Sequence, residues 1–430
     1  MRSKTMLILC VLWALAALPA AAQWRQYTPP GGPDSRDTDP ETVIEQEMEN
    51  ARWNLGPLRL SPWFGINQLA YVDDVFAGSG SEEESFSDFN AVVGAGLTGY
   101  LPSGSDTYWV FDLTPEYIYW QDLSERRLLA GRYGAGFFGF YNRLQIQATA
   151  GRQESQRTFS AEFPQPTVLQ EDHVTLDAAL RLTGKLSLEG RAESRRIRDQ
   201  SDEFEDPRQA DFAALDRDEQ SVRVGLRFRP SERVGLFLGA EDSELDSTSS
   251  ARDLSNEGTS PVIGLDLEGG RSSFNVELAQ RDLEPIGASE FGTYDEVSGF
   301  AQAFFEIGWR LDLRIYGSKT PVLSLLPEYA YYDEQRVGVA LGSKLGRRAR
   351  LEIFADQGEN RYERRFPTAP ERTDDLTSFG AELRFEITKS LALTVRAEDS
   401  QYDSSVPGQD RDVFNVRTGL ALSADRLLWR

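Results

Sequence analysis

The most constraining feature of this sequence is a two-residue alternation of apolar and polar side chains, which recurs from Leu58 to Leu428. In one run, Val222, Val224, Leu226 and Phe228 alternate with Arg223, Gly225, Arg227 and Arg229. A period of two places successive side chains on opposite faces of a β-strand. We count about 18 such runs, with 16 as the alternative, near the 16–18 strands of barrels that enclose an aqueous channel.

The connections between these runs alternate between short and long. The short ones are 103–105, 142–143, 183–185, 230–232, 269–272, Arg310, 346–348 and 388–390. The long ones cover approximately 73–85, 121–126, 158–170, 200–216, 245–258, 284–292, 319–330, 360–374 and 402–411. In a transmembrane barrel, short turns face the periplasm and long loops face outside. The pattern therefore predicts an all-β fold, a transmembrane antiparallel up-and-down β-barrel formed by residues 58–430.

Two other β folds could show a similar pattern. A repeat of about 40 residues also occurs in propellers, but a propeller blade has four short strands and each repeat here has two long ones. A soluble antiparallel protein would also alternate. Against it, runs such as 218–229 and 377–388 have about 12 residues, enough for the 9–11 that a membrane-crossing strand needs.

The first residues have the pattern of a secretory signal peptide. Arg2 and Lys4 precede an uncharged apolar stretch from Met6 to Leu18, and small residues follow up to Ala22. We therefore expect residues 1–22 to be removed on export. The single cysteine of the chain, Cys10, lies inside this segment, so we expect no disulfide in the exported protein.

Residues 23–57 differ from the rest of the chain. Asp39 and Pro40 are a typical helix start, and 42–53 is predicted to be a short helix that ends before Gly56. Short isolated helices are marginal in water. A periplasmic tail with a partly disordered helix and a small plug in the barrel are both consistent with the sequence.

The charged face of the strands is predicted to line a hydrated lumen, because a one-residue slip in register would turn these charges into lipid. Three-residue turns would pair Glu382 with Arg396 and Asp177 with Arg191, and would pair Phe228 with Val234 on the outer face. The candidate pore-lining residues are Arg181, Arg191, Arg223, Arg227, Arg384, Arg396, Arg417, Asp177, Glu189, Glu352, Glu382, Glu386 and Glu398. Such charges could guide solutes, or they could only pair with one another in a water-filled interior.

Catalytic and metal-binding patterns are missing from the sequence. His173 is the only histidine, so no site with two histidine ligands can form. No Gly-x-Ser-x-Gly motif is present to mark a hydrolase nucleophile, and a Ser–His–acid arrangement around His173 stays a minor alternative. We therefore expect no enzyme activity and no cofactor.

Two stretches resemble the start of a poorly characterised group of outer-membrane β-barrel porins. They are Gly56-Pro57-Leu58-Arg59-Leu60-Ser61-Pro62 and Tyr71-Val72-Asp73-Asp74-Val75-Phe76, together about 20 residues by our count of the motif. Asp74 departs from the pattern, in which asparagine is expected. Some members of the group are associated with exopolysaccharide secretion loci. The resemblance implies an outer-membrane barrel and no established substrate.

These observations predict a passive or weakly selective pore in the outer membrane of a Gram-negative bacterium. The alternative is a structural or accessory barrel of a surface polysaccharide export system, with export proteins as partners. Outer-membrane lipid and lipopolysaccharide are expected partners, and so is the barrel-assembly machinery, because the last strand is followed by the aromatic Trp429. The net charge of −23 argues against nucleic acid as a partner, since phosphate would be repelled.

Overall fold

The computed structural model describes residues 40–72, 87–158, 161–163, 166–200, 212–249, 252–388, 390–407 and 409–423. The expected signal peptide and the end at Trp429 lie outside these residues. So does the centre of the acidic loop that follows Asp199. No helix in the described residues is long and apolar enough to span a membrane.

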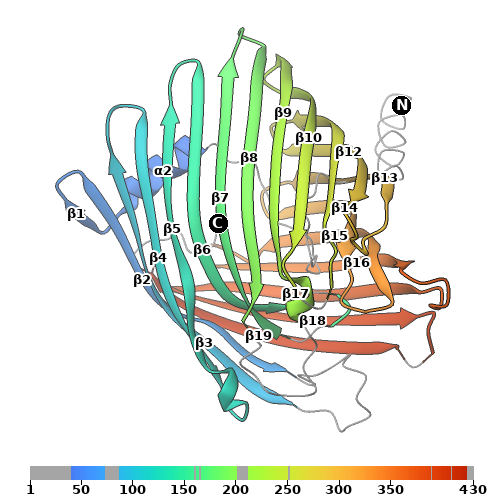
Figure 1. The fold of residues 1–430 in the computed structure, drawn as a ribbon. Helices are drawn as coiled ribbons and strands as arrows, with labels where there is room; N and C mark the ends of the chain where they lie inside the picture. The colour runs from blue at the N-terminus through green and yellow to red at the C-terminus, as the bar shows by residue number, and fades with distance from the viewer. Residues whose placement is uncertain are drawn as a thin grey trace, which may run out of the picture.

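The described chain is almost entirely β-strand (Figure 1). One α-helix, α2, spans Pro40–Asn50, and two 3-10 turns, η1 and η3, span Ser124–Arg126 and Phe212–Leu215. The strands are β1 (Trp53–Leu55), β2 (Leu58–Val72), β3 (Asp88–Pro102), β4 (Thr107–Trp120), β5 (Leu128–Phe140), β6 (Leu144–Thr158), β7 (Pro166–Arg181), β8 (Leu186–Asp199), β9 (Arg217–Ser231), β10 (Val234–Ser247), β11 (Asn256–Glu268), β12 (Ser272–Pro285), β13 (Tyr294–Ile307), β14 (Leu311–Leu323), β15 (Tyr329–Lys344), β16 (Ala349–Arg364), β17 (Thr373–Thr388), β18 (Leu391–Ser404) and β19 (Arg411–Ser423).

The sheet closes on itself. Each of β2 to β19 pairs with its sequence neighbours in antiparallel fashion, and β19 also pairs with β2, where Leu422 lies opposite Phe64. In the described residues the barrel has 18 strands. The short strand β1 also pairs with β2 through a tight turn at Gly56, whose φ is 64°. The predicted up-and-down barrel of about 18 strands is confirmed. A closed sheet leaves no edge strand whose backbone groups would lack partners in lipid.

The two faces of each strand differ as the alternation predicts. On β9, Val224 and Leu226 are 52% and 44% exposed on the outer face. Arg223 and Arg227 lie on the opposite face of the same strand and bond to acids on β12, β11 and β8. Side chains of strands that are not neighbours can meet only on the concave side, so the charged face is the inner one.

The cross-strand register agrees with the predictions at two pairs and differs at a third. Asp177 lies opposite Arg191, and Glu382 lies opposite Arg396, as predicted. Phe228 lies opposite Leu236, however, and not opposite Val234. The turn falls closer to Val234 than predicted, and a β-bulge between Val234 and Leu236 shifts the register by one residue. The observed pairing therefore differs from the predicted one by two residues, and Leu236 stays on the outer face beside Phe228.

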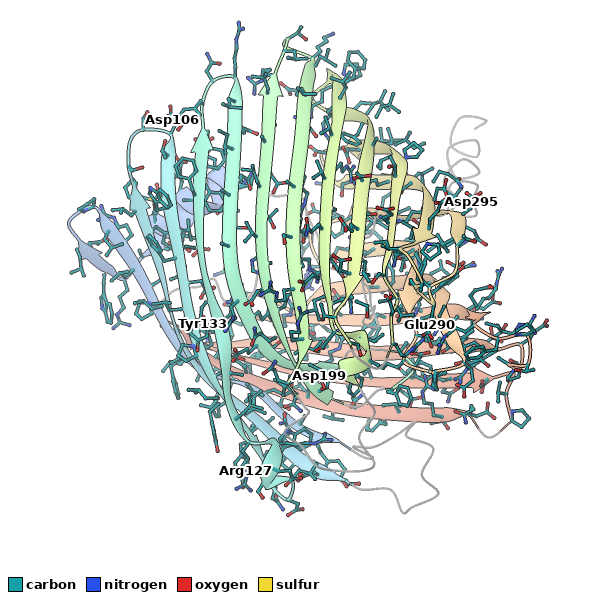
Figure 2. The ribbon with its side chains drawn as sticks, in the orientation of Figure 1. Asp106, Arg127, Tyr133, Asp199, Glu290 and Asp295 are labelled. Carbon is teal, nitrogen blue, oxygen red and sulfur yellow. The ribbon has the colours of Figure 1, made fainter. Side chains whose placement is uncertain are left out.

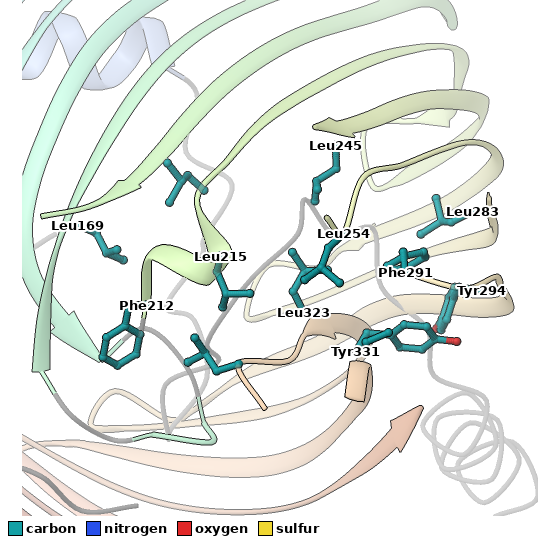
Figure 3. Close-up of a cluster of buried hydrophobic side chains, with 13 residues drawn as sticks. Leu169, Phe212, Leu215, Leu245, Leu254, Leu283, Phe291, Tyr294, Leu323 and Tyr331 are labelled. Carbon is teal, nitrogen blue, oxygen red and sulfur yellow. The ribbon is translucent and has the colours of Figure 1, made fainter. Parts of the chain in front are cut away.

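The connections give the barrel two unlike ends. Short turns, such as the one between β7 and β8, lie at one end, which we call the short-turn end. The long connections lie at the other, the long-loop end. Their described parts contribute a buried apolar cluster that includes Phe212 and Leu215 of η3, Leu254, Phe291 and Leu325 (Figure 3). The long loops therefore fold partly into the barrel.

The β14–β15 hairpin takes part in this inward fold. Its pairing with β13 stops at Lys319, although β14 continues to Leu323. Leu323 and Tyr331 occupy outward positions of the alternation, yet they are buried together with Tyr294 of the inner face of β13. The tip of the hairpin therefore bends into the lumen.

Helix α2 lies at the short-turn end, against the inner face of β3 to β5. It begins at Pro40 as predicted and ends at Asn50, before the predicted end at Trp53. Its buried Ile44 packs with Tyr108 and Phe140 of the barrel wall.

Candidate functional site: the barrel lumen

The candidate site is the charged inner face of the barrel. All thirteen candidate pore-lining residues of the sequence alternate with outward apolar residues on their strands. They come from β7 (Asp177, Arg181), β8 (Glu189, Arg191), β9 (Arg223, Arg227), β16 (Glu352), β17 (Glu382, Arg384, Glu386), β18 (Arg396, Glu398) and β19 (Arg417). Figure 2 shows side chains along the full length of these strands.

On the β8–β12 side of the lumen, arginines form ion pairs that span several strands. Arg223 donates two hydrogen bonds to Glu277 of β12, one of them at 2.6 Å. Arg227 donates to Glu189 of β8 at 2.8 and 2.9 Å, and also to Asp266 of β11. Charge-assisted bonds of this kind are stronger than neutral ones and restrain both partners.

On the β14–β19 side the pattern repeats. Arg314 donates to Glu352 at 3.0 Å. Arg396 donates to Glu398 at 2.8 Å and lies 3.6 Å from Glu382. Two other candidates join the same acids, Arg384 at Glu382 and Arg417 at Glu398, the latter at 3.4 Å. The lumen arginines of this side are thus paired with acids.

The remaining candidates are more exposed. Arg191 pairs with Glu193 at 2.9 Å and lies 3.7 Å from Asp177. Arg181 and Glu386 are exposed near the ends of β7 and β17. These residues share the inner face with the ion-paired group but are more open to solvent.

Two cavities open along this wall. One of about 280 Å³ is lined by charged residues of both signs, including Asp177, Arg191 and Arg223, and by Gln145 and Gln147. A second, of about 510 Å³, lies towards the short-turn end beside Phe300, Gln302 and Phe304. The first cavity balances three acids against three arginines, and both cavities offer hydrogen-bond donors and acceptors.

A short segment lies inside the lumen near the long-loop end. We call Ala161–Phe163, from the β6–β7 connection, the lumen strap. Glu162 accepts hydrogen bonds from the Ser324 hydroxyl at 2.5 Å and from the Leu325 backbone N–H at 2.6 Å. Because β6–β7 and β14–β15 lie on nearly opposite sides of the barrel, these contacts are made inside the lumen.

Neighbouring loops hold the strap and its partner hairpin in place. Arg252 donates to the carbonyls of Ser324 and Tyr329, both at 2.6 Å. On the other side, Arg411 donates to the carbonyl of Ala161, which is buried beside Tyr402. The strap thus joins three parts of the barrel that are far apart in sequence.

Glu162 is buried, and its environment affects its charge. Burial raises the pKa of its carboxyl above the ordinary value, and this is the largest effect. The hydrogen bonds from Ser324 and Leu325, with the positive charges of Arg372 and Arg252, act in the opposite direction.

The sequence did not predict these contacts. The long connections were expected to face outside the barrel, and none of Glu162, Arg252 or Ser324 was a candidate. One signal was available: Phe163, Phe212 and the Leu323–Leu326 stretch place apolar residues in connections that are otherwise polar. Apolar side chains in a long loop indicate that the loop packs against something.

His173 lies on the inner face of β7. Its cross-strand neighbours are Gly151 and Arg195, so neither position offers a serine or an acid. Within the described residues, no group of three histidine, cysteine or acidic side chains could hold a metal ion.

A closed antiparallel barrel of 18 strands with an apolar outer face and a charged lumen is the fold of the outer-membrane porins. Among solved structures, the chain is similar to Pseudomonas aeruginosa OpdK with vanillate, with a TM-score of 0.52 and 11% identity over 85% of this chain and 98% of that one. It is also similar to a BenF-like porin from Pseudomonas fluorescens Pf-5, with a TM-score of 0.51 and 11% identity over 85% of this chain and 98% of that one. A third similar structure is Pseudomonas aeruginosa OpdO, with a TM-score of 0.51 and 12% identity over 85% of this chain and 96% of that one. No model of a protein family and no curated protein matches the chain.

Proposed function

We propose that this protein is a passive channel for small polar solutes in the outer membrane, narrowed at its long-loop end by the lumen strap. The observation that carries the proposal is the contrast between the two faces of a closed sheet. The outer face presents apolar side chains such as Leu226, and the inner face presents ion pairs and two cavities. Water-filled barrels with lined lumens conduct ions and small solutes.

The lumen supports weak charge preference. Arg223, Arg227 and Arg396 all have acidic partners, so few of their hydrogen bonds remain for an anionic solute. The similar OpdK structure contains vanillate, a carboxylate. An anion preference here would require free arginines, so we propose passage of neutral or weakly charged polar solutes.

Helix α2 is proposed to narrow the short-turn end. Its Ile44 and Met48 pack on Tyr108, Phe138 and Phe140 of the inner wall. Removal of residues 23–52 from the exported protein should then raise the single-channel conductance. An equal conductance with and without this segment would show that the helix does not obstruct the mouth.

Export by residues 1–22, contact with lipopolysaccharide and insertion by the barrel-assembly machinery belong to the same proposal. The comparisons give no support to the alternative, an accessory barrel of surface polysaccharide export.

The test of the channel is electrical. Purified protein in a planar lipid bilayer should produce stepwise conductance, and a salt gradient should give a reversal potential near zero. Folded, inserted protein that conducts no current would contradict the proposal.

A further inference from the structure

Several inner-face side chains reach a partner two strands away, and a glycine lies on the strand between. Tyr316 of β14 lies opposite Gly338 of β15, and its hydroxyl donates to Asp356 of β16 at 3.0 Å. A Cβ added to Gly338 would fall within 3.0 Å of the ring of Tyr316 and of the side chain of Asp356. The ring therefore occupies the space that a side chain at position 338 would fill.

An ion pair follows the same rule four residues further along β14 and β15. Arg350 of β16 donates to both carboxylate oxygens of Asp312 of β14, at 2.7 and 2.8 Å. Between them stands Gly342 of β15, where an added Cβ would fall within 3.0 Å of both side chains.

Aromatic rings lie on glycines elsewhere in the wall too. Phe354 of β16 covers Gly380 of β17, and the Arg396 guanidinium lies 4.5 Å from the centre of that ring. Phe237 of β10 covers Gly225 of β9, with the Arg223 guanidinium at 4.4 Å. Aromatic cover of a strand glycine is a known stabilising device, and a guanidinium over a ring adds a cation–π attraction.

Backbone conformation does not explain these glycines. None of Gly225, Gly338, Gly342 and Gly380 is among the described glycines with positive φ. What each position requires is space, because a neighbouring side chain crosses directly over its Cα. On an inner face, a side chain that cannot lie in such a gap must project towards the centre of the lumen.

We propose that Gly338, Gly342, Gly380 and Gly225 are positioning residues, which hold lumen side chains flat against the wall and so set the open width of the channel. This inference rests on the proposed channel function. It assigns to these glycines a role in conductance that their conformational freedom alone would not give them.

The test is a double-mutant cycle at Gly338 and Tyr316, read as single-channel conductance. Gly338→Ala should lower the conductance, because the methyl group displaces the Tyr316 ring into the lumen. Tyr316→Ala should raise it. In the Tyr316→Ala background the glycine substitution should have a much smaller effect, since the ring it displaces is gone and only the Asp356 side chain remains close to the methyl group.

Gly184→Ala is the matched control, because a Cβ at this short turn would meet nothing within 4 Å. If Gly338→Ala fails to fold, Gly342→Ala offers a second site at which only flexible side chain ends must move. A silent wild-type barrel would count against the channel itself. A conducting wild type with unchanged conductance in Gly338→Ala, or with the same loss in both backgrounds, would overturn the positioning role.

Discussion

The carboxylate of Glu162 accepts a hydrogen bond from the hydroxyl of Ser324 at 2.5 Å, across 162 residues of sequence and across the lumen of the barrel. This bond joins the lumen strap to the inward-bent β14–β15 hairpin. With the Leu325 N–H and the Arg252 contacts, it ties long-loop connections to one another inside the barrel.

Removal of this carboxylate should open the constriction. Glu162→Ala deletes two hydrogen bonds to a buried charged group, each worth about 1.5–3 kcal/mol. We expect a higher and noisier single-channel conductance. Glu257→Ala is a suitable control, since Glu257 is an exposed acid at the same end of the barrel. Identical traces for Glu162→Ala and wild type would show that the strap does not limit the current.

The raised pKa of Glu162 predicts a dependence on pH. When the strap is released, the carboxyl is solvated and has its ordinary pKa, so the closed form binds a proton more tightly than the open form. Closing is therefore favoured as the pH falls through the raised pKa towards the ordinary one, and conductance should fall with it. The direction already includes the effects of Arg252, Arg372 and Ser324, which surround Glu162 and lower its pKa by less than burial raises it.

Glu162→Gln should remove that pH dependence, because the amide cannot ionise. The measurement is conductance across a pH series for wild type and Glu162→Gln. A wild-type conductance that rises on acidification, or an unchanged slope in the variant, would assign the titration to another group.

The Arg223–Glu277 pair predicts charge selectivity of opposite sign in two variants. Glu277→Gln leaves the Arg223 charge without its partner and should shift the reversal potential towards anion selectivity. Arg223→Gln should shift it towards cation selectivity, and the double variant should return close to the wild-type value. Both side chains are less than one-fifth exposed, so solvent screens them only in part. Shifts of the same sign in both single variants would contradict this assignment.

The outer face predicts a stability difference between neighbouring positions of β9. Leu226→Arg places a charge on the apolar face and should cost about 2–4 kcal/mol near the bilayer midplane. Gln220→Arg, at a polar outward position of the same strand, should cost much less. Equilibrium unfolding in lipid vesicles measures both, and equal costs would argue against a lipid-facing surface at Leu226.

The number of strands and the inner and outer faces could be predicted because side chains in a strand alternate with a period of two residues. In a membrane barrel, a one-residue shift in pairing register would place charges in lipid. The pairs Asp177–Arg191 and Glu382–Arg396 follow from that rule with a simple turn. The predicted pair of Phe228 and Val234 was wrong because the turn falls closer to Val234 and a one-residue bulge follows it, and no local signal in the sequence marks either feature.

The constriction could not be predicted, for a different reason. The bonds of Glu162 depend on which loops meet inside a closed barrel, and loop contacts have no periodic signature. Two of the ion-pair partners, Glu277 of Arg223 and Asp266 of Arg227, were hidden for the same reason, since β12 and β11 are not sequence neighbours of β9.

The most direct test of the channel is a recording of single molecules of the full-length exported protein in a planar bilayer, together with the Glu162→Ala variant. We expect discrete current steps from the wild type, with little preference between cations and anions, and larger steps from the variant. A folded barrel that inserts into the bilayer and passes no current in either form would contradict the account.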